Sequence, residues 1–200
     1  MAAASPIDLL REIESKSLAH KSLTVTEQAR ANEWRGVGFR VGGKELVASM
    51  ISVVEVLDPI QCTRVPSSKV WFDGIANVRG QLVPVSDLYS FLYGERRPQD
   101  RDTRILVFKL ANTVAGLTVG AVTGIRSFPE ESRDQRMPDI DEPLRPFVVA
   151  CFHRGGSDYP VFDFNRLVGN DRFMHITETA EQSSNTNRLT TASRQVRGKV

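Results

Sequence analysis

The sequence predicts an all-β core made of two small five-stranded barrels, with short capping helices and an added N-terminal helix. Three observations favour this fold class. From about residue 36 onward, apolar residues fall in short runs between glycine, proline and polar clusters, which is typical of strands. The second half of that region repeats the first. Two copies of a small unit can share one core, and closing short antiparallel strands into barrels removes exposed edges.

The N-terminus carries the signals of a helix start. Ser5 supplies a capping hydroxyl, Pro6 occupies the first helical position, and Asp8 places an acid in the first turn. Apolar residues follow at roughly helical spacing up to about His20. We therefore expect residues 1–35 to form an N-terminal helix and a linker. The apolar face of this helix can pack against its own chain or bind a partner, and the sequence leaves both open.

Five strands are expected in the first copy, at about 36–41, 45–48, 53–57, 74–78 and 82–85. Val53, Val54 and Val56 cannot all face one core in an alternating strand, so Val54 should point away from it. Its side chain can then line a groove or be covered by a loop of the same domain.

The stretch GIANVRGQLVPVSDLYSFL, residues 74–92, predicts a hairpin that leads into a helix. Arg79-Gly80 separates two apolar runs and predicts the turn. Pro84 cannot donate a ladder hydrogen bond, so the second strand should be an edge strand or be free on one side there. Asp87 is expected to cap a helix over residues 88–93, which Gly94 would end in the left-handed conformation.

The second copy preserves the spacing of the first. Phe39 recurs as Phe108 and Val56 recurs as Ile125, the same number of residues later in both cases. The turn, the helix cap and the helix stop recur as Arg154-Gly155, Asp163 and Gly169.

These matches predict one folded domain over residues 36–176. Barrel one is expected at about 36–93 and barrel two at about 103–170, joined by a charged surface connection. Residues 127–146 contain four prolines and should form a long surface loop. Residues 177–200 lack periodic apolar positions and are expected to be a disordered tail.

Composition and charge argue against several classes of protein. The 26 Lys and Arg residues exceed the 24 Asp and Glu residues by a net charge of only +2, which is too little for the basic footprint of a nucleic-acid binder. No run approaches the roughly 18 apolar residues of a membrane span, so direct membrane insertion is not expected, and the N-terminus lacks a secretion signal. We therefore expect a cytoplasmic protein. A small-barrel nucleic-acid or ligand-binding protein remains the alternative from another class.

The residues that could carry chemistry are sparse. Cys62 and Cys151 are not in a metal-binding spacing and are expected to stay reduced, and the three histidines lie far apart in the sequence. Asp87 and Asp163 resemble a catalytic pair, but their positions in the repeat identify them as helix caps. We expect no catalytic residues, no metal and no cofactor, and a function carried by surfaces.

Three stretches resemble the CheW-like coupling proteins of bacterial chemosensory arrays: VVEVL from Val53, TRVPSS from Thr63, and GIANVRGQLVPVSDL from Gly74. The resemblance extends over residues 36–168. The chain departs from the usual family pattern at Val78, where leucine is common, and at Gly120, where many members carry an aspartate. The second departure leaves open what that position does in the second barrel.

The resemblance implies two intertwined SH3-like barrels and a non-enzymatic adaptor. Such an adaptor joins the cytoplasmic tip of methyl-accepting chemoreceptors to the regulatory domain of a CheA-like histidine autokinase, and it is recruited to membrane-associated receptor arrays. By similarity, the first barrel would dock on the kinase and the groove between barrels would receive the receptor tip. The residues that match the family's protein-binding surfaces are Val53, Val54, Glu55, Asn77, Arg79 and Gly80.

The long N-terminal helix, the EWRGVGFRVGG entry and the polar tail are similar to the PilI-type branch, which serves type IV pilus twitching motility. A flagellar chemotaxis coupling protein is the alternative within the family. A detached regulatory domain of a kinase is a further alternative, although the chain lacks a phosphotransfer or ATP-binding segment.

Overall fold

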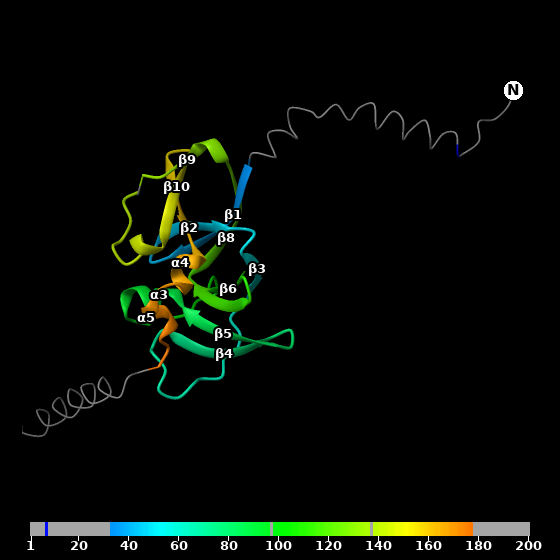
Figure 1. Ribbon diagram of the computed structural model, residues 1–200, viewed down its shortest axis with the longest axis vertical. Coiled ribbons are helices and arrows are strands. Elements are labelled where there is room, and N and C mark those ends of the chain that lie inside the picture. Colours follow the sequence, from blue (N-terminus) through cyan, green and yellow to red (C-terminus); the bar gives the residue numbers. More distant parts are fainter. Residues whose placement is uncertain (1–6, 8–32, 97, 137, 178–200) are drawn as a thin grey trace, which may run out of the picture.

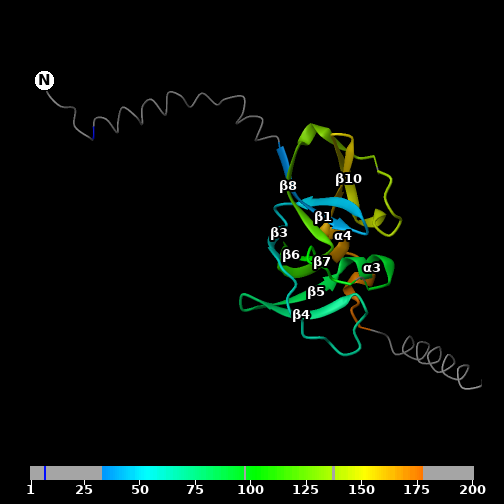
Figure 2. The ribbon, with the colours of Figure 1, turned by 180° about the vertical axis from the view of Figure 1, so that it is seen from behind.

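The computed structural model describes residue 7 and residues 33–96, 98–136 and 138–177. These residues form two β-sheets that lie one above the other, with short helices packed beside them (Figures 1 and 2). Apart from Ile7, the predicted N-terminal helix lies outside the described residues, and so does the predicted tail from residue 178 onward. No helix in the described part of the chain has the length and apolar character needed to cross a bilayer.

One sheet has six strands in the order β8-β1-β2-β11-β10-β9, and the other has five in the order β3-β6-β7-β5-β4. The six-stranded sheet contains β1 (Glu33–Val41), β2 (Lys44–Ser49), β8 (Ala121–Pro129), β9 (Arg133–Asp134), β10 (Val148–Arg154) and β11 (Ser157–Phe162). The five-stranded sheet contains β3 (Val53–Leu57), β4 (Phe72–Val78), β5 (Gln81–Asp87), β6 (Arg104–Leu110) and β7 (Thr113–Val119).

Each sheet takes strands from both copies of the repeat. The first two strands of each copy lie in the sheet formed by the remaining strands of the other copy. Strands β1 and β2 lie with β8 to β11, and strands β6 and β7 lie with β3 to β5. Each sheet joins the copies once in parallel, through β2 with β11 and β7 with β5, and once antiparallel, through β1 with β8 and β3 with β6. The predicted fold class of intertwined barrels is therefore confirmed.

The ranges 36–93 and 103–170 do not correspond one to one to the two sheets. The apolar pattern identifies the repeated unit, but it carries no information on which copy a strand pairs with. The six-stranded sheet also gains β9, a two-residue strand inside the region 127–146 that was predicted to be loop.

In the five-stranded sheet, the segment that follows the outer strand β3 contacts the other outer strand, β4. Thr63, in the segment after β3, forms a bridge with Ile75 of β4 through two backbone hydrogen bonds of 2.8 and 2.9 Å. Gly74 makes this approach possible, because its φ is +128° and a Cβ there would lie 2.2 Å from the Thr63 carbonyl oxygen. A glycine is required at this position.

The largest hydrophobic cluster lies between the sheets and contains residues of both copies. Phe39 of β1 meets Phe162 edge-on with ring centroids 5.7 Å apart. Phe108, its counterpart in the repeat, stacks on Phe164 with centroids 4.3 Å apart. Each sheet adds only a small cluster of its own. The two copies thus share one core, which a single copy is too small to form.

The helices are short and capped by aspartate or asparagine: α3 (Leu88–Tyr93), α4 (Phe164–Val168) and α5 (Asp171–Met174), with 3-10 turns η1 (Glu130–Ser132) and η2 (Arg145–Phe147). Asp87 accepts a hydrogen bond from the Ser90 amide (2.6 Å), and Asp163 accepts one from the Asn165 amide (2.7 Å). Gly94 ends α3 with a φ of +81°. Gly169 ends α4 but differs from that expectation, because its φ is −76° and therefore right-handed.

Candidate protein-docking surface

Strand β3 is an outer strand that carries exposed valines. Val53 pairs with Phe108 and Glu55 pairs with Val107, so Val54 is the extra residue of a β-bulge. The Val54 side chain points away from the core and is 61% exposed, as expected from the sequence. Val53 is half-buried against the shared core, so its role is to support the strand and not to present a contact.

The hairpin of β4 and β5 has an inward and an outward face. Ala76, Val83 and Val85 are buried, while the alternate side chains are exposed, among them Leu82 at 71%. Arg79 (φ 51°) and Gly80 (φ 85°) both have positive φ, which is the geometry of a two-residue type I′ turn. The Asn77 side-chain oxygen accepts a hydrogen bond from the Gly80 amide (2.8 Å) and stiffens the turn.

An ion pair joins the hairpin tip to β3. The Arg79 guanidinium donates to the Glu55 carboxylate. The hairpin projects from the body on the side where β3 lies (Figures 1 and 2). Glu55 is largely covered, with 21% of its side chain exposed, whereas 80% of the Arg79 side chain faces solvent. The arginine is therefore available to a partner while it is held in place from one side.

We call these neighbouring elements the hairpin–β3 surface, defined by Val54, Glu55, Val56, Asn77, Arg79 and Leu82. The structure brings together Glu55 and Arg79, which are far apart in sequence, and it places Gly80 in the turn itself. Leu82 was not among the predicted site residues. Its signal was present, because two consecutive apolar residues, Leu82 and Val83, cannot both face the core of an alternating strand.

The sequence reasoning also did not identify Ile51 as an exposed apolar residue, although it is 96% exposed. It lies in the turn between β2 and β3, where the Ser52 amide donates to the Ser49 carbonyl oxygen (3.1 Å). An apolar pair flanked by two serines could have indicated this, since a residue in a tight turn cannot reach the core.

The second copy presents different chemistry at the equivalent place. The turn of the β10–β11 hairpin consists of Gly155 and Gly156, which both have positive φ. Arg154, which the sequence repeat aligned with Arg79, is instead the last residue of β10, pairs with Ser157, and donates to the carbonyl oxygen of Ser127 (3.1 Å) and not to a carboxylate. Gly124 stands where the repeat places Glu55. The two hairpins are thus similar in shape and different in charge, so a partner can distinguish them.

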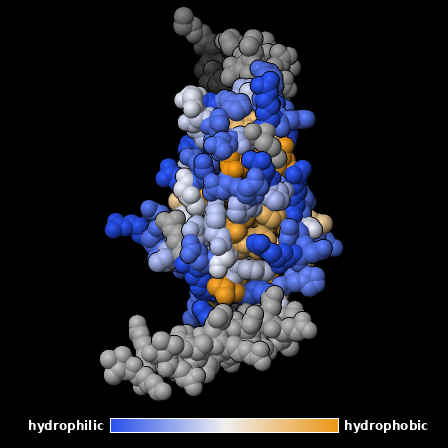
Figure 3. All heavy atoms as spheres, turned by 90° about the vertical axis from the view of Figure 1, so that its left-hand side faces the viewer, coloured by the Kyte–Doolittle hydropathy of each residue, from blue (hydrophilic) through white to orange (hydrophobic). Residues whose placement is uncertain are grey.

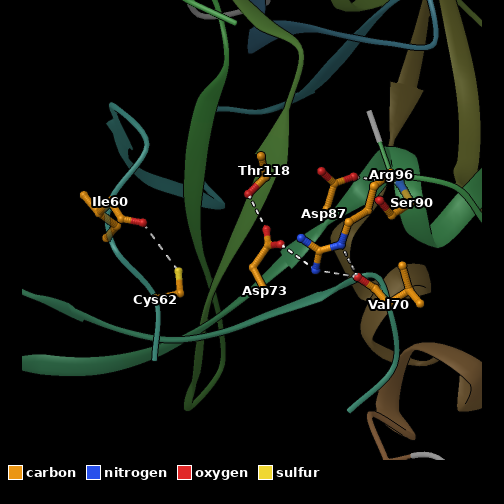
Figure 4. A network of polar contacts seen from close by, with 8 residues as sticks. All are labelled: Ile60, Cys62, Val70, Asp73, Asp87, Ser90, Arg96 and Thr118. Carbon is orange, nitrogen blue, oxygen red and sulfur yellow. Dashed lines mark hydrogen bonds and ion pairs between the residues drawn. The ribbon is translucent and has the colours of Figure 1, made fainter. Parts of the chain in front are cut away.

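A partly buried polar network connects β4 with β7 and the segment after α3 (Figure 4). Thr118 donates to the Asp73 carboxylate (3.1 Å), and Arg96 lies 3.5 Å from the same carboxylate while it donates to the Val70 carbonyl oxygen (2.8 Å). Burial raises the pKa of the Asp73 carboxyl above its ordinary value, and the charge of Asp87 adds to the rise. The network attaches the segment after α3 to β4 and β7, which is a structural role.

The nearby thiol of Cys62 donates weakly to the Ile60 carbonyl oxygen, and burial raises its pKa, with the charge of Asp73 as a second cause. A thiol of raised pKa is a poor nucleophile at neutral pH. The face of the molecule seen in Figure 3 is mostly hydrophilic, with small separate hydrophobic groups. That face does not offer one large apolar patch.

Comparisons with known proteins agree on one family. Residues 35–172 match the family model described as the CheW-like domain. Protein PilI of Pseudomonas aeruginosa is 34% identical over 172 residues, which is 86% of this chain and 96% of that protein. Chemotaxis protein CheW of Helicobacter pylori is 30% identical over 87 residues, 44% of this chain and 53% of that protein.

Protein FrzA of Myxococcus xanthus is 37% identical over 92 residues, 46% of this chain and 56% of that protein. Among solved structures, the scaffolding protein TtCheW from Thermoanaerobacter tengcongensis superposes with a TM-score of 0.58 at 24% identity, covering 65% of this chain and 88% of that one. This likeness confirms the fold. The chain belongs to the CheW-like family, whose members are non-enzymatic scaffold and adaptor proteins of chemosensory systems.

Proposed function

We propose that this protein couples methyl-accepting chemoreceptors to a CheA-like histidine autokinase in a membrane-associated array, and that the array controls type IV pilus twitching motility. The observation that carries the proposal is the hairpin–β3 surface: exposed apolar side chains on β3 and on the hairpin, and a solvent-facing arginine that joins the two, on a chain of the CheW-like family. Apolar contacts flanked by a placed charge are typical of specific protein interfaces.

The extent of similarity supports the pilus branch over flagellar chemotaxis. Protein PilI is matched over 96% of its length, whereas the Helicobacter pylori CheW is matched over 53%. The match to PilI also covers more of this chain, 86% against 44%. Disruption of the gene in its host should therefore abolish twitching while flagellar swimming persists. Loss of swimming with intact twitching would contradict this assignment.

The proposed mechanism is positional. The protein makes no covalent change and instead holds receptor and kinase in a geometry that a receptor signal can bias. The hairpin–β3 surface would dock on the kinase regulatory domain, and the groove between barrels would receive the receptor tip. Individual interfaces can be small, near the roughly 1,200 Å² lower end of specific complexes, because many weak contacts repeat through an array.

Charge reversal at the hairpin tip tests the surface. Arg79→Glu should weaken co-sedimentation with the kinase about tenfold or more, because it removes the exposed positive charge and places two carboxylates beside each other. Arg154→Glu, beside the equivalent turn of the second copy, is the matched control and should bind as the wild type does.

A charge swap separates a direct contact from a structural role. The double variant Glu55→Arg with Arg79→Glu restores an opposite-charge pair between the hairpin and β3. If the guanidinium contacts the partner, binding stays weak in the double variant. Recovery of binding would show that Arg79 acts only by holding the hairpin, and it would remove this residue from the interface.

A further inference from the structure

Three potential metal ligands gather at one end of the six-stranded sheet. The ligand atoms of Cys151, His153 and Asp158 all lie within 4.8 Å of one another. Cys151 and His153 are two residues apart on β10 and therefore share a face of the sheet. Asp158 of β11 is the direct cross-strand partner of His153. Strand pairing, and not sequence spacing, assembles the cluster.

The imidazole of His153 lies between two carboxylates. Its Nδ1 atom is 2.7 Å from an oxygen of Asp158, and its Nε2 atom is 3.8 Å from an oxygen of Asp134. Asp134 belongs to β9 and is the cross-strand partner of Cys151. A histidine that binds a metal through one nitrogen characteristically donates its other N–H to a carboxylate. Asp134 is the nearest carboxylate to Nε2, and at 3.8 Å it has to move closer to accept that hydrogen bond.

The cluster combines one buried side chain with two half-exposed ones. Cys151 is fully buried, whereas about half of the His153 side chain (50%) and of the Asp158 side chain (53%) is exposed. An ion can therefore enter past the imidazole and the carboxylate and reach the thiol behind them.

We propose that Cys151, His153 and Asp158 form a binding site for a divalent transition-metal ion of the zinc class, with Asp134 as the residue that orients His153. One sulfur, one nitrogen and one oxygen donor suit Zn²⁺ or Co²⁺ and disfavour Mg²⁺ and Ca²⁺, which take oxygen ligands. Bond lengths of roughly 2.0–2.3 Å place tetrahedral ligand atoms roughly 3.3–3.8 Å apart. The side chains thus need to move by about 1 Å or less to admit the ion.

Metal binding would join three strands, because its ligands and their support come from β9, β10 and β11. Three protein ligands leave a fourth tetrahedral position open to water or to a side chain of a partner. The site lies in the six-stranded sheet, so variants within it leave the hairpin–β3 surface in the other sheet unchanged. The metal proposal can therefore fail while the adaptor proposal stands, and the adaptor proposal can fail while the metal proposal stands.

The test is a titration of the reduced, tag-free full chain with Co²⁺ alone. We expect one equivalent to bind, with a thiolate-to-cobalt charge-transfer absorption in the near ultraviolet, and Zn²⁺ to displace it. Cys151→Ala, His153→Ala and Asp158→Asn should each lose this absorption at the same Co²⁺ concentration. Asp134→Asn should bind about 10- to 100-fold more weakly.

Two matched controls use the other cysteine and an exposed histidine. Cys62→Ser and His175→Ala should bind Co²⁺ as the wild type does. Absence of the absorption from the wild type, or its persistence in Cys151→Ala, would overturn the proposal. If circular dichroism shows that Cys151→Ala is unfolded, the variants at the two exposed ligands decide the outcome. A thiolate-to-cobalt absorption that is undiminished in both His153→Ala and Asp158→Asn refutes the site, and loss of that absorption in these variants supports it.

Discussion

Arg79 combines a strained backbone with an exposed side chain. A non-glycine residue with φ of +51° is uncommon, and the left-handed region costs an L-residue roughly 1–2 kcal/mol. A glycine or asparagine would form the same turn with less strain. Arginine is therefore not the residue that the turn geometry favours, which points to its guanidinium as the useful part.

This argument predicts that Arg79→Gly separates stability from binding. The substitution relieves roughly 1–2 kcal/mol of backbone strain, loses an exposed ion pair worth about 0–1 kcal/mol, and adds the unfolded-chain entropy of a glycine, about 0.5–1 kcal/mol, so the free energy of unfolding should change by between about −1 and +1.5 kcal/mol. Binding to the kinase should fall. Urea denaturation and co-sedimentation measure the two effects, and destabilisation by more than about 1 kcal/mol would contradict the argument.

Asp73 is a residue whose protonation affects stability. Because its folded-state pKa is raised, the folded protein holds the proton more tightly than the unfolded chain does. This contribution to stability is fully present below the unfolded pKa of about 3.9 and is lost as the pH rises through the folded value. At neutral pH the ionised carboxylate therefore lowers the free energy of unfolding, and the contacts with Thr118 and Arg96 offset only part of this loss.

Asp73→Asn removes the titrating group and keeps an oxygen to accept the Thr118 hydrogen bond. The free energy of unfolding of this variant, relative to the wild type, should therefore rise between about pH 3 and pH 7. Urea denaturation at several pH values measures the difference. A difference that stays constant or falls over this range would show that the pKa of Asp73 is not raised.

At the scale of elements, the two helix caps are alike in chemistry and differ in burial. Asp87 is buried and caps α3, whereas the capping contact of Asp163 at α4 is exposed. Both helices present apolar residues to the shared core. The caps therefore fix where the chain leaves each sheet and enters the core.

We predict that Asp87→Ala lowers the free energy of unfolding more than Asp163→Ala does. Loss of an N-cap costs about 0.5–2 kcal/mol, and the exposed site falls at the lower end because water can replace the lost oxygen. Thermal unfolding of both variants provides the comparison. A larger loss for Asp163→Ala would mean that burial of the cap does not set its contribution.

At the scale of the whole molecule, exchange of strands between the copies makes the two sheets one folding unit. Neither sheet can form from one copy alone, and most buried aromatic side chains lie in the shared cluster. The two sheets should therefore unfold together in one cooperative transition.

The fluorescence of two tryptophans can follow the unfolding of the two sheets separately. Trp34 packs on Phe128 and Phe152 in the six-stranded sheet, and Trp71 packs on Phe91 and Phe173 beside the five-stranded one. The single-tryptophan variants Trp34→Phe and Trp71→Phe should each show a fluorescence transition that coincides with loss of circular dichroism.

Phe108→Ala, in the shared cluster, should lower both midpoints and cost about 3–5 kcal/mol. In a single cooperative unit the two tryptophan signals shift together, because the lost packing destabilises both sheets at once. A Phe108→Ala protein in which only one of the two tryptophan transitions moves would contradict a single unit.

The sequence by itself determined the elements and the repeat. The hairpin at Arg79-Gly80, the outward direction of Val54 and the cap at Asp87 follow from local rules: the alternation of strands, the turn chemistry of glycine and the preference of aspartate for helix starts. A contiguous motif likewise indicates the family. Such signals are readable because each depends only on residues close in the chain.

Only the tertiary structure decided which strands pair and which distant side chains meet. The apolar patterns of the two copies are nearly equivalent, so the pattern cannot tell a strand's own copy from the other, and the shared core selects the exchange. The same holds for Arg79 with Glu55 and for Cys151 with His153 and Asp158. Their proximity depends on strand register and sheet closure, which arise from the free energy of the whole fold and not from any one segment.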